Sequence, residues 1–548
     1  MGGISEKLRT AAADKAFELR VLHGAGIVEP LRPDKALKIG TTFLRWGASP
    51  ATGVATAAIH HPHEIALVDE RGSLSWERLQ LRTNALAHSF AAMGIGYGDG
   101  VGIMCRNHRG FVEATLAAAK LGASALYLNT MFAGPQLVEV TKREAPKALV
   151  YDAEFAGLLE GVEDSVIRIV GWEEGEDPEA TTLDQLIAAG SEADHKPPPD
   201  KPRFVILTSG TTGTPKGAQR SSPDGLMSIA SLLDKIPYRS RSTMVIAAPL
   251  FHSWGFFHFV MSLPTASTMV LRRRFDPEGT LQAVQRHRAD VLAAVPVMIQ
   301  RILTLPEETL SAYDLSSLRI TALSGSALPG ELAIAWMDRF GDSVYNLYGS
   351  TEVAYATVAT PEDLRAAPGT AGKPPRGTTV RILDENGLDV PQGGTGRIFV
   401  GNEMSFEGYT GGGGKESIDG LLCSGDVGHI DAAGRLFIDG RDDEMIVSGG
   451  ENVFPREVED LLADHEAVVE VAVIGVEDEE FGQRLKAFVV TVDGAEVSDA
   501  ELKSHVKANL AGYKTPREIE FLDELPRNAT GKVLKRDLRA RETPQSTA

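Results

Sequence analysis

Residues 208–217, TSGTTGTPKG, concentrate groups that bind phosphate. Three glycines let backbone amides approach a polyanion closely, and four Thr hydroxyls and one Ser hydroxyl add hydrogen-bond donors. Lys216 supplies a point charge suited to a triphosphate or a pyrophosphate. The nucleotide P-loop pattern, G-x-x-x-x-G-K-[ST], does not fit, because Pro215 precedes the lysine and Gly217 follows it. The stretch predicts a phosphate-binding loop of another type, and the alternative is a surface turn rich in Gly and hydroxyls.

The same segment resembles the phosphate-loop signature of the adenylate-forming enzymes. This family includes acyl-CoA synthetases, luciferases and the adenylation domains of peptide synthetases. Five further motifs follow in the family's order, and the resemblance covers residues 50–540. They are SGSA at 324–327, YGSTE at 348–352, SGD at 424–426, SGGENV at 448–453 and PRNATGK at 526–532. Six motifs in the right order rarely arise by chance.

The resemblance implies a ligase that activates a carboxylic acid with ATP. The acid oxygen attacks the α-phosphate, pyrophosphate leaves, and the acyl-AMP then passes its acyl group to CoA. Charge grows on phosphoryl oxygens in the first step, so the site needs cations and positioned donors more than a nucleophile. The implied enzyme is an AMP-forming acid–thiol ligase with ATP, Mg²⁺ and CoA as its cofactors.

The family motifs assign roles to individual residues of this sequence. By resemblance, Thr351 contacts the α-phosphate, Glu352 holds Mg²⁺ and Tyr348 lies near adenine; a carboxylate suits a hard cation. Asp426 accepts both ribose hydroxyls, with Arg441 as its partner, and Lys532 bridges the carboxylate and the α-phosphate. The implied catalytic residues are Lys216, Thr351, Glu352 and Lys532. The residues implied to bind ATP and AMP are Thr208, Ser209, Gly210, Thr211, Thr212, Gly213, Thr214, Lys216, Ser324, Gly325, Ser326, Tyr348, Gly349, Ser350, Thr351, Asp426, Arg441 and Lys532. Taken singly, YGSTE reads as a solvated turn and Lys532 as a solvated charge.

The sequence departs from the family pattern at the ribose motif. Ser424 stands where Thr is usual, and Leu421 lies where the family has a bulky aromatic residue. The hydroxyl survives, so these changes bear on turnover rate more than on reaction type.

The resemblance also implies that one site is used twice. Asp443 aligns with the hinge about which relatives rotate the C-terminal domain between the two half-reactions. Gly449, Gly450 and Glu451 then line the tunnel for the CoA pantetheine arm. The alternative for the glycine pair is an ordinary turn before a helix that starts near Pro455.

The acid pocket is expected at residues 249–255, PLFHSWG, which resemble the family's acid-binding segment. Phe251, His252, Gly255 and Val295 are its expected residues. Amino-acid-activating relatives place an Asp near here, and its absence indicates a neutral hydrophobic acid, with a fatty acid preferred. A ligase that hands acyl-AMP to a carrier protein and an aryl-acid CoA ligase stay open as alternatives. The arginines at 272–274 are expected to be a solvated strand end rather than a patch that admits fatty acids.

Short apolar runs alternate with helix-patterned stretches over most of the chain. Strands at 65–69, 101–105, 124–128, 148–151 and 203–207 and helices at 76–93 and 111–120 predict an α/β fold of doubly wound, mostly parallel sheets. From residue 377, short strands broken by Gly predict a small β-rich subdomain, and the chain after Arg441 reads as a small α+β unit. The predicted domains are an N-terminal extension at 1–48, an adenylation domain at 49–440 and a mobile C-terminal domain at 441–548.

Composition limits the partners and the compartment. A formal charge of −20 argues against a nucleic-acid partner, because phosphate backbones need a basic face. Two cysteines, Cys105 and Cys423, cannot cross-link 548 residues, and neither has obvious metal-ligand partners nearby, so a reducing cytosol is expected. Neither a membrane span nor a signal peptide is apparent. Residues 1–48 carry several Lys and Arg and are expected to be a packed extension, with a weak membrane-surface contact as the alternative.

Overall fold

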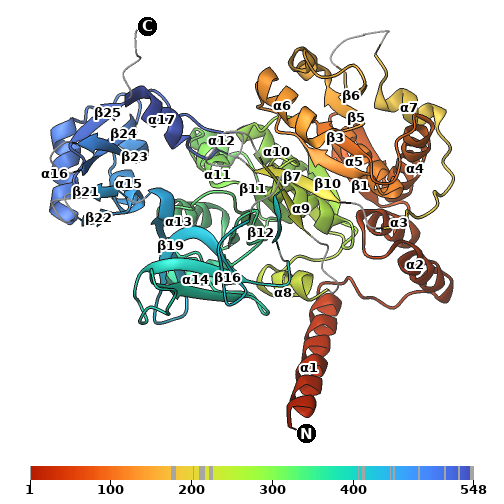
Figure 1. Ribbon diagram of the computed structural model, residues 1–548, viewed down its shortest axis with the longest axis horizontal. Helices are drawn as coiled ribbons and strands as arrows, with labels where there is room; N and C mark the ends of the chain where they lie inside the picture. The colour runs from red at the N-terminus through yellow and green to blue at the C-terminus, as the bar shows by residue number, and fades with distance from the viewer. Residues whose placement is uncertain are drawn as a thin grey trace.

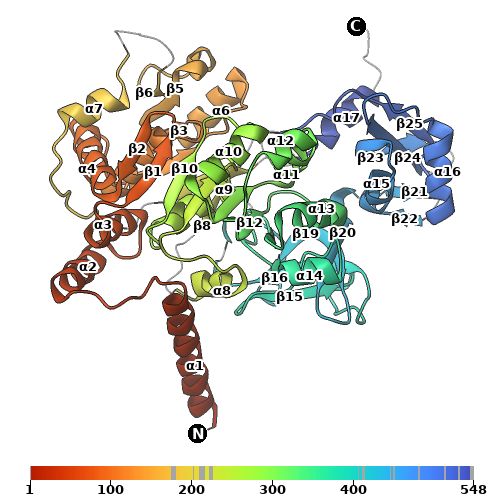
Figure 2. The same cartoon turned by 180° about the vertical axis from the view of Figure 1, so that it is seen from behind.

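Two sheets with parallel centres make up the larger part of the protein (Figures 1 and 2). The computed structural model describes residues 2–173, 180–200, 203–208, 216–220, 226–404, 406–409, 414–444, 446–448, 451–478, 482–510, 514–528 and 531–542. The first sheet has the order β14-β13-β12-β11-β9-β10-β1-β2 and is parallel from β1 to β13, with antiparallel strands at both edges. Its strands are β1 (Ile65–Asp69), β2 (Gly72–Ser75), β9 (Thr243–Ile246), β10 (Thr268–Leu271), β11 (Val291–Ala294), β12 (Ile320–Leu323), β13 (Val344–Tyr348) and β14 (Thr357–Ala359).

The second sheet has the order β17-β8-β7-β4-β3-β5-β6. The five strands β7, β4, β3, β5 and β6 run parallel to one another. At one edge, β8 pairs antiparallel with β7, and β17 pairs antiparallel with β8. Its strands are β3 (Gly100–Met104), β4 (Ser124–Tyr127), β5 (Ala148–Asp152), β6 (Ile167–Trp172), β7 (Phe204–Thr208), β8 (Lys216–Arg220) and β17 (Phe406–Tyr409). Helices link successive parallel strands, which is the connection such sheets require.

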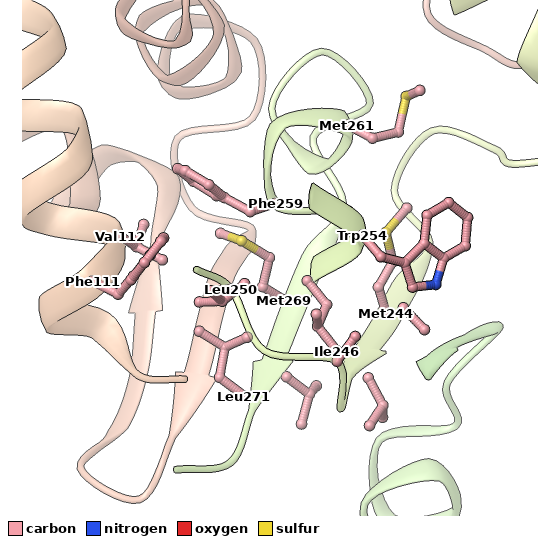
Figure 3. Packing of buried hydrophobic residues seen from close by; sticks show 14 of the residues in the cluster. Phe111, Val112, Met244, Ile246, Leu250, Trp254, Phe259, Met261, Met269 and Leu271 are labelled. Carbon is pink, nitrogen blue, oxygen red and sulfur yellow. The ribbon is translucent and has the colours of Figure 1, made fainter. Parts of the chain in front are cut away.

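The helices of this part cover both sheets and separate them. They are α3 (Pro50–His60), α4 (Trp76–Ala92), α5 (Arg109–Leu121), α6 (Gly134–Glu144), the 3₁₀ helix η1 (Ala153–Leu159), α7 (Leu183–Ala189), α8 (Met227–Lys235), α9 (Ser253–Ser262), α10 (Pro277–His287), α11 (Pro296–Leu303), α12 (Glu307–Ser311), α13 (Gly330–Phe340) and α14 (Pro361–Ala366). Every residue of α5 is buried, because this helix lies inside the molecule. Figure 3 shows Phe111 of α5 and Phe259 of α9 pointing toward one another, with Met269 and Leu271 of β10 close by.

A small antiparallel sheet follows the parallel ones. It contains β15 (Thr379–Leu383), β16 (Gly396–Gly401), β18 (Ser417–Ile418), β19 (Leu421–Ile430) and β20 (Leu436–Arg441). One face packs on its own apolar cluster, which includes Ile382, Ile398 and Val400.

The C-terminal part stands to one side of the rest in both views (Figures 1 and 2). It contains the 3₁₀ turn η2 (Asp442–Glu444), β21 (Ile446–Ser448), β22 (Glu451–Val453), α15 (Pro455–Ala463), β23 (Val468–Asp478), β24 (Gly482–Thr491), α16 (Asp499–Asn509), β25 (Glu518–Phe521) and α17 (Lys535–Glu542). Two separate apolar clusters, one around Val473 and one around Phe488, give it cores of its own. The predicted fold class is confirmed: parallel α/β sheets, a β-rich unit and a distinct C-terminal α+β unit.

Two helices precede the first strand. Helix α1 (Gly2–Gly24) projects from the body (Figure 1), and α2 (Pro33–Trp46) lies at its edge next to α3. Phe17 of α1 is buried against Met227 and Ala230 of α8. The Arg376 guanidinium lies 4.6 Å from the Phe17 ring and 2.8 Å from Asp14, so the second half of α1 is packed onto the body. None of the helices in the described ranges has the length and apolarity that crossing a membrane requires.

Two expectations about polar residues were wrong. Arg273 is not solvated, because its side chain is largely buried and lies 2.8 Å from the Glu154 carboxylate, which Arg106 also approaches at 2.6 Å. Arg274 is exposed, as expected, although it too lies 2.8 Å from Glu154. Hydrogen bonds from Arg106, despite partial burial, lower the pKa of Glu154 to about 2. This cluster ties the loop after β10 to η1.

Cys105 also has possible metal-ligand neighbours, His108 and Asp152, all buried, with ligand atoms within 4.8 Å of one another. The chain itself satisfies this group: the His108 ring is 2.7 Å from Asp152 through Nε2 and accepts from the Gly110 amide through Nδ1. Burial raises the pKa of the Cys105 thiol well above its ordinary value. The buried contact between His108 and Asp152 fastens the end of β5 to the start of α5.

The packing between α5 and α9 gives the first testable prediction. Phe259 has no exposed surface, and removing its ring by Phe259→Ala leaves a cavity beside Phe111. We expect the free energy of unfolding to fall by about 3–5 kcal/mol, because lost transfer energy and the cavity add. Thermal unfolding measures it, with Leu388→Ala as the control, since Leu388 is 64% exposed and should change stability by less than about 0.5 kcal/mol. Equal effects of the two changes would contradict this view of the core.

Candidate active site

The carboxyl ends of neighbouring parallel strands of the first sheet open into one cavity of about 1420 Å³. Residues after β9, β11, β12 and β13 line it, as is typical of ligand sites in open α/β sheets. The Trp254 indole at the start of α9 donates to the carbonyls of Ala294 and Ala322, at 3.1 and 3.2 Å. This pair of bonds fixes α9 against the ends of β11 and β12, so the helix forms a wall of the cavity.

The turn after β13 carries the YGSTE residues. Gly349 is required by packing, because a Cβ at this position would lie 2.2 Å from the Ala354 carbonyl oxygen. The turn closes through Ala354, whose φ of +62° is uncommon for a residue with a side chain. All five residues of the motif, Tyr348, Gly349, Ser350, Thr351 and Glu352, line the cavity.

Glu352 is held by two hydroxyls. Ser350 Oγ donates to Glu352 Oε2 at 2.9 Å, and the Tyr409 hydroxyl donates to Oε1 at 2.8 Å. The two bonds hold both carboxylate oxygens and so fix the orientation of the side chain at the cavity wall. Oxygen donors of this kind are what Mg²⁺ prefers, so the residues present fit a magnesium ion bound jointly with substrate phosphates. Tyr409 was missed by the sequence analysis, since nothing local marks a tyrosine 57 positions away as a partner.

Tyr348, Asp426 and Arg441 join the parallel sheet to the small sheet. The Tyr348 hydroxyl donates to Asp426 Oδ2 at 2.5 Å, and Arg441 Nη1 lies 3.5 Å from Oδ1. Asp426 and Arg441 are register partners on β19 and β20, which places both side chains on the same face of the sheet. Burial, together with the Asp426 charge, raises the pKa of Tyr348 well above its ordinary value, so the phenol stays a donor.

Lys532 reaches the same cavity from the C-terminal part. Its backbone amide donates to Asn528 Oδ1 at 2.9 Å, and Gly531 before it has a φ of +77°. A Cβ on Gly531 would lie 2.2 Å from Val297 Cγ1, so this turn packs directly on α11. The Gln300 amide also donates to the Val469 carbonyl at 3.2 Å. These contacts dock the C-terminal part so that Lys532 lines the same cavity as Glu352 and Asp426.

Two of the four expected acid-pocket residues line the cavity. His252 and Val295 do, and so does the adenine-side segment Ser324, Gly325 and Ser326. Phe251 and Gly255 are not among the lining residues of the cavity, and their role in the acid pocket stays a prediction. Phe251 is buried in the main apolar cluster, and Gly255 closes on the Pro249 carbonyl, where a Cβ would lie 2.2 Å from the oxygen. Both residues are buried close to His252 along the chain, Phe251 directly before it and Gly255 in α9.

The far end of the cavity was missed altogether by the sequence analysis. It is apolar on one side, where α9 contributes Phe256, Phe257, Val260 and Met261. The N-terminal extension forms the other side through residues of α2, α3 and the segment before them: Gly26, Ile27, Val28, Glu29, Leu31, Ile39, Phe43, Ala48, Ser49, Pro50, Thr52, Gly53, Thr56, Ala57, His60 and His61. The apolar sequence of α9 was the available signal, but the extension gives no local sign of a binding role.

Several predicted residues lie partly or wholly outside the described chain. Ser209, Gly210, Thr211, Thr212, Gly213 and Thr214 of the phosphate loop, and Gly449 and Gly450 of the CoA tunnel, are outside the described residues. Thr208 and Lys216 are register partners on the antiparallel strands β7 and β8 that flank the loop. Glu451 pairs with Ser448 in the β21–β22 hairpin, and Asp443 lies in η2 directly after β20.

Comparison with known proteins supports the same site. Residues 54–410 match the AMP-binding enzyme family, and residues 457–532 match the AMP-binding enzyme C-terminal domain. A feruloyl-CoA synthase from an Amycolatopsis species is 33% identical, and the match covers 88% of this chain and 96% of that protein. A fatty acid–[acyl-carrier-protein] ligase, ScoC, from Streptomyces coeruleorubidus is 29% identical, covering 89% and 96%. The crystal structure of ATP-bound MatB from Rhodopseudomonas palustris superposes with a TM-score of 0.80 at 27% identity, over 92% of this chain and 98% of that one.

The chain belongs to the AMP-binding enzyme family. Within it, the chain is an adenylate-forming ligase of the CoA-ligase type, a class of AMP-forming acid–thiol ligases that works with ATP, Mg²⁺ and CoA.

His252 gives a prediction about pH. Burial lowers its pKa to about 4, and among the described residues its Nε2 has no hydrogen-bond partner. Between pH 6.5 and about pH 4, His252 therefore binds a proton in the unfolded chain but not in the folded chain. Its contribution to the stability of the fold falls as the pH drops below its ordinary pKa of 6.5. The loss is about 1.4 kcal/mol per pH unit, or about 2 kcal/mol at pH 5.

We expect His252→Phe to unfold at a Tm that falls less between pH 7 and pH 5 than the wild-type Tm does. Thermal unfolding at both pH values measures this, with His63→Phe as the matched control because the His63 side chain is exposed. A wild-type pH dependence that His252→Phe leaves intact would contradict the assignment.

Proposed function

We propose that this enzyme activates a fatty acid and transfers it to CoA. The observation that carries the proposal is the set of large apolar residues that line the cavity from α9 and α2: Phe256, Phe257, Val260, Met261, Ile39 and Phe43. The cavity exceeds the usual 300–1,000 Å³ of small-molecule pockets, which leaves room for a nucleotide and a long tail together. The imidazole beside the acid is neutral near pH 7, because burial lowers the pKa of His252 to about 4, and so it adds no charge to a neutral tail.

The polar end of the cavity suits the first half-reaction. A carboxylate oxygen forms a bond to the α-phosphorus of ATP, the bond from that phosphorus to the β-phosphate oxygen breaks, and pyrophosphate leaves. Lys532 lines this part of the cavity, and its role is to screen the repulsion between the two anions; Thr351 donates to a phosphoryl oxygen. Residues 208–217 keep the phosphate-binding role that the family resemblance implies. Glu352 holds Mg²⁺, which supplies charge neutralisation at the phosphates when bound. Asp426, oriented by Tyr348, accepts the ribose hydroxyls with Arg441 beside it.

The second half-reaction needs a different arrangement of the C-terminal part. The CoA thiolate attacks the acyl carbon, the bond from that carbon to AMP breaks, and the thiol proton passes to solvent. Lys532 occupies the cavity in the present arrangement, so the C-terminal part turns about Asp443 in η2 to bring Gly449, Gly450 and Glu451 to the acyl-AMP. The small contact at Gly531 and Val297, rather than a shared core, permits this movement.

Two other functions have specific support. The relative ScoC is named for a carrier-protein acceptor, which favours a fatty-acyl-AMP ligase. The feruloyl-CoA synthase is named for an aryl acid, which would fill only the inner part of the cavity.

An acid panel separates these functions. We expect thioester formation with ATP and CoA to be faster with fatty acids than with ferulic or indoleacetic acid by at least tenfold in kcat/KM, because only the long tail reaches α2 and α3. Coupled assays of pyrophosphate and thioester measure both half-reactions. A preference for aryl acids would overturn the fatty-acid proposal, and acyl-AMP that accumulates in the presence of CoA would favour a carrier-protein acceptor.

Substitutions at Lys532 and Asp443 test the two arrangements. Lys532→Ala should reduce pyrophosphate release by about 10²-fold or more, yet convert supplied acyl-AMP and CoA to thioester, because only adenylation brings two anions together. Asp443→Pro should keep pyrophosphate release and lose thioester formation, since proline fixes φ at the hinge.

The matched controls are Lys503→Ala, a lysine on α16 ion-paired with Asp499, and Asp443→Ala, which leaves φ free. Both half-reactions are measured on all four variants after circular dichroism shows that each is folded. Equal loss of the two half-reactions in each variant would contradict a turning C-terminal domain.

A further inference from the structure

Helix α2 presents an apolar face that the rest of the chain does not cover. Leu37, Phe43 and Leu44 are 69%, 49% and 89% exposed, and Leu44 is the most exposed of the large apolar side chains described. At helical spacing they share one face with Ala36 and Gly40, both of which are exposed. No residue of α2 is buried. A 14-residue helix with such a face has no folding reason to point it outward.

The opposite side of α2 attaches it to the body. Lys35, Ile39, Thr42 and Trp46 are half-buried and recur at a helical spacing of three to four residues. Lys35 Nζ donates to the His60 carbonyl at the end of α3 at 2.8 Å. Pro33 at the first turn and the Gly47 amide, which donates to the Phe43 carbonyl, define the two ends of the helix. The outward direction of the apolar face is therefore set by packing on the other side.

Basic residues flank the apolar face. Lys38 and Arg45 lie seven positions apart, both exposed, on the edge next to Leu37 and Leu44. The nearby Asp34 is paired with Arg32 at 3.2 Å. Residues 1–48 hold eight Lys and Arg against five Asp and Glu, whereas the whole chain has a formal charge of −20. Residues 1–48 therefore carry a small net positive charge within an acidic chain, and Lys38 and Arg45 place part of it beside the exposed apolar face.

The same helix borders the acid cavity. Ile39 and Phe43 of α2 are lining residues of the cavity whose other end holds Glu352 and Lys532. Figures 1 and 2 both show α2 at the outer edge of the molecule, away from the C-terminal part. A tail that reaches the cavity past α2 therefore meets an apolar path from the surface inward.

We propose that α2 docks this enzyme on an anionic lipid surface, with Leu37, Phe43 and Leu44 among the acyl chains and Lys38 and Arg45 at the headgroups. An interfacial helix of this type combines a large apolar face with a basic polar face. Docking places the outer end of the cavity at the membrane, where fatty acids are dissolved. The docking itself is independent of the proposed function, whereas the delivery of fatty acid into the cavity rests on the proposed function.

A second copy of the chain suits this face less well. A 14-residue helix is about 21 Å long, and an apolar stripe roughly 10 Å wide covers roughly 200 Å². Stable dimers bury about 800 Å² per partner. A lipid surface needs no matching partner, so a few inserted side chains and two or three basic residues provide useful affinity.

Co-sedimentation with vesicles tests the docking. The wild-type protein is expected to bind phosphatidylcholine vesicles that contain phosphatidylglycerol, and to bind pure phosphatidylcholine at least tenfold less well. The double variant Leu37→Glu, Leu44→Glu should bind the anionic vesicles at least tenfold less well, while the matched control Leu388→Glu, at a site 64% exposed, should bind like wild type. Lys38→Gln with Arg45→Gln should remove the preference for the anionic lipid. Glutamate and glutamine keep the helix propensity of α2, so these variants should fold.

The enzyme assay tests delivery. Thioester formation from oleic acid held in anionic vesicles should fall about tenfold or more in the Leu37→Glu, Leu44→Glu variant, while formation from soluble hexanoic acid should not change. No thioester from either acid with the wild-type protein would refute the proposed function and leave the vesicle result standing. The docking would be overturned if the wild-type protein did not bind anionic vesicles, or if the double variant bound them as well as the wild type does. It would also be overturned by a change in oligomeric state by light scattering in the double variant with its vesicle binding intact, since the face would then join two copies.

Discussion

The hydrogen bond between Tyr348 and Asp426 holds the site together, because it joins three parts of the chain at one point. Tyr348 ends β13 of the large parallel sheet, and Asp426 lies on β19 of the small antiparallel sheet. Arg441, the register partner of Asp426, is the last residue of β20 and leads directly into η2 and the C-terminal part. A partly buried bond of 2.5 Å between a phenol and a carboxylate has a narrow geometric tolerance, so it fixes the small sheet relative to the strand ends.

The lining of the cavity differs in polarity on the two sides of the Tyr348–Asp426 bond. Toward the C-terminal part it is polar, with Glu352 held by Ser350 and Tyr409, and with Lys532 delivered by a turn that packs on Val297. Toward the N-terminus α9 gives the cavity an apolar wall, and α2 and α3 add a wall of mixed apolar and polar residues. A substrate with a charged head and an apolar tail matches this division, because burying either end in the wrong half would leave charge or apolar surface uncompensated.

The packing within the large parallel sheets is tighter than the contact between those sheets and the C-terminal part. The α5–α9 contact lies inside the main core, and Phe259 and Phe111 have no exposed surface. The C-terminal part instead has separate cores and meets α11 through contacts such as Gly531 with Val297 and Gln300 with Val469. Cores resist rearrangement because they are close-packed, whereas a small contact between two such cores can separate and re-form. Mobility is therefore expected at the junction and not within the sheets.

The sequence alone determined the parts that depend on short spacing. Six ordered motifs specified the family, and alternating apolar runs specified parallel sheets. The sequence could not identify Tyr409 as the partner of Glu352 or add α2 and α3 to the wall of the cavity. Nor could it pair Arg273 and Arg274 with Glu154, or bring Asp152 to Cys105. Motif residues lie within a few positions of one another and are fixed by local backbone geometry, whereas these contacts join residues dozens to hundreds of positions apart. Only the tertiary packing of strands, helices and loops decides which of them meet.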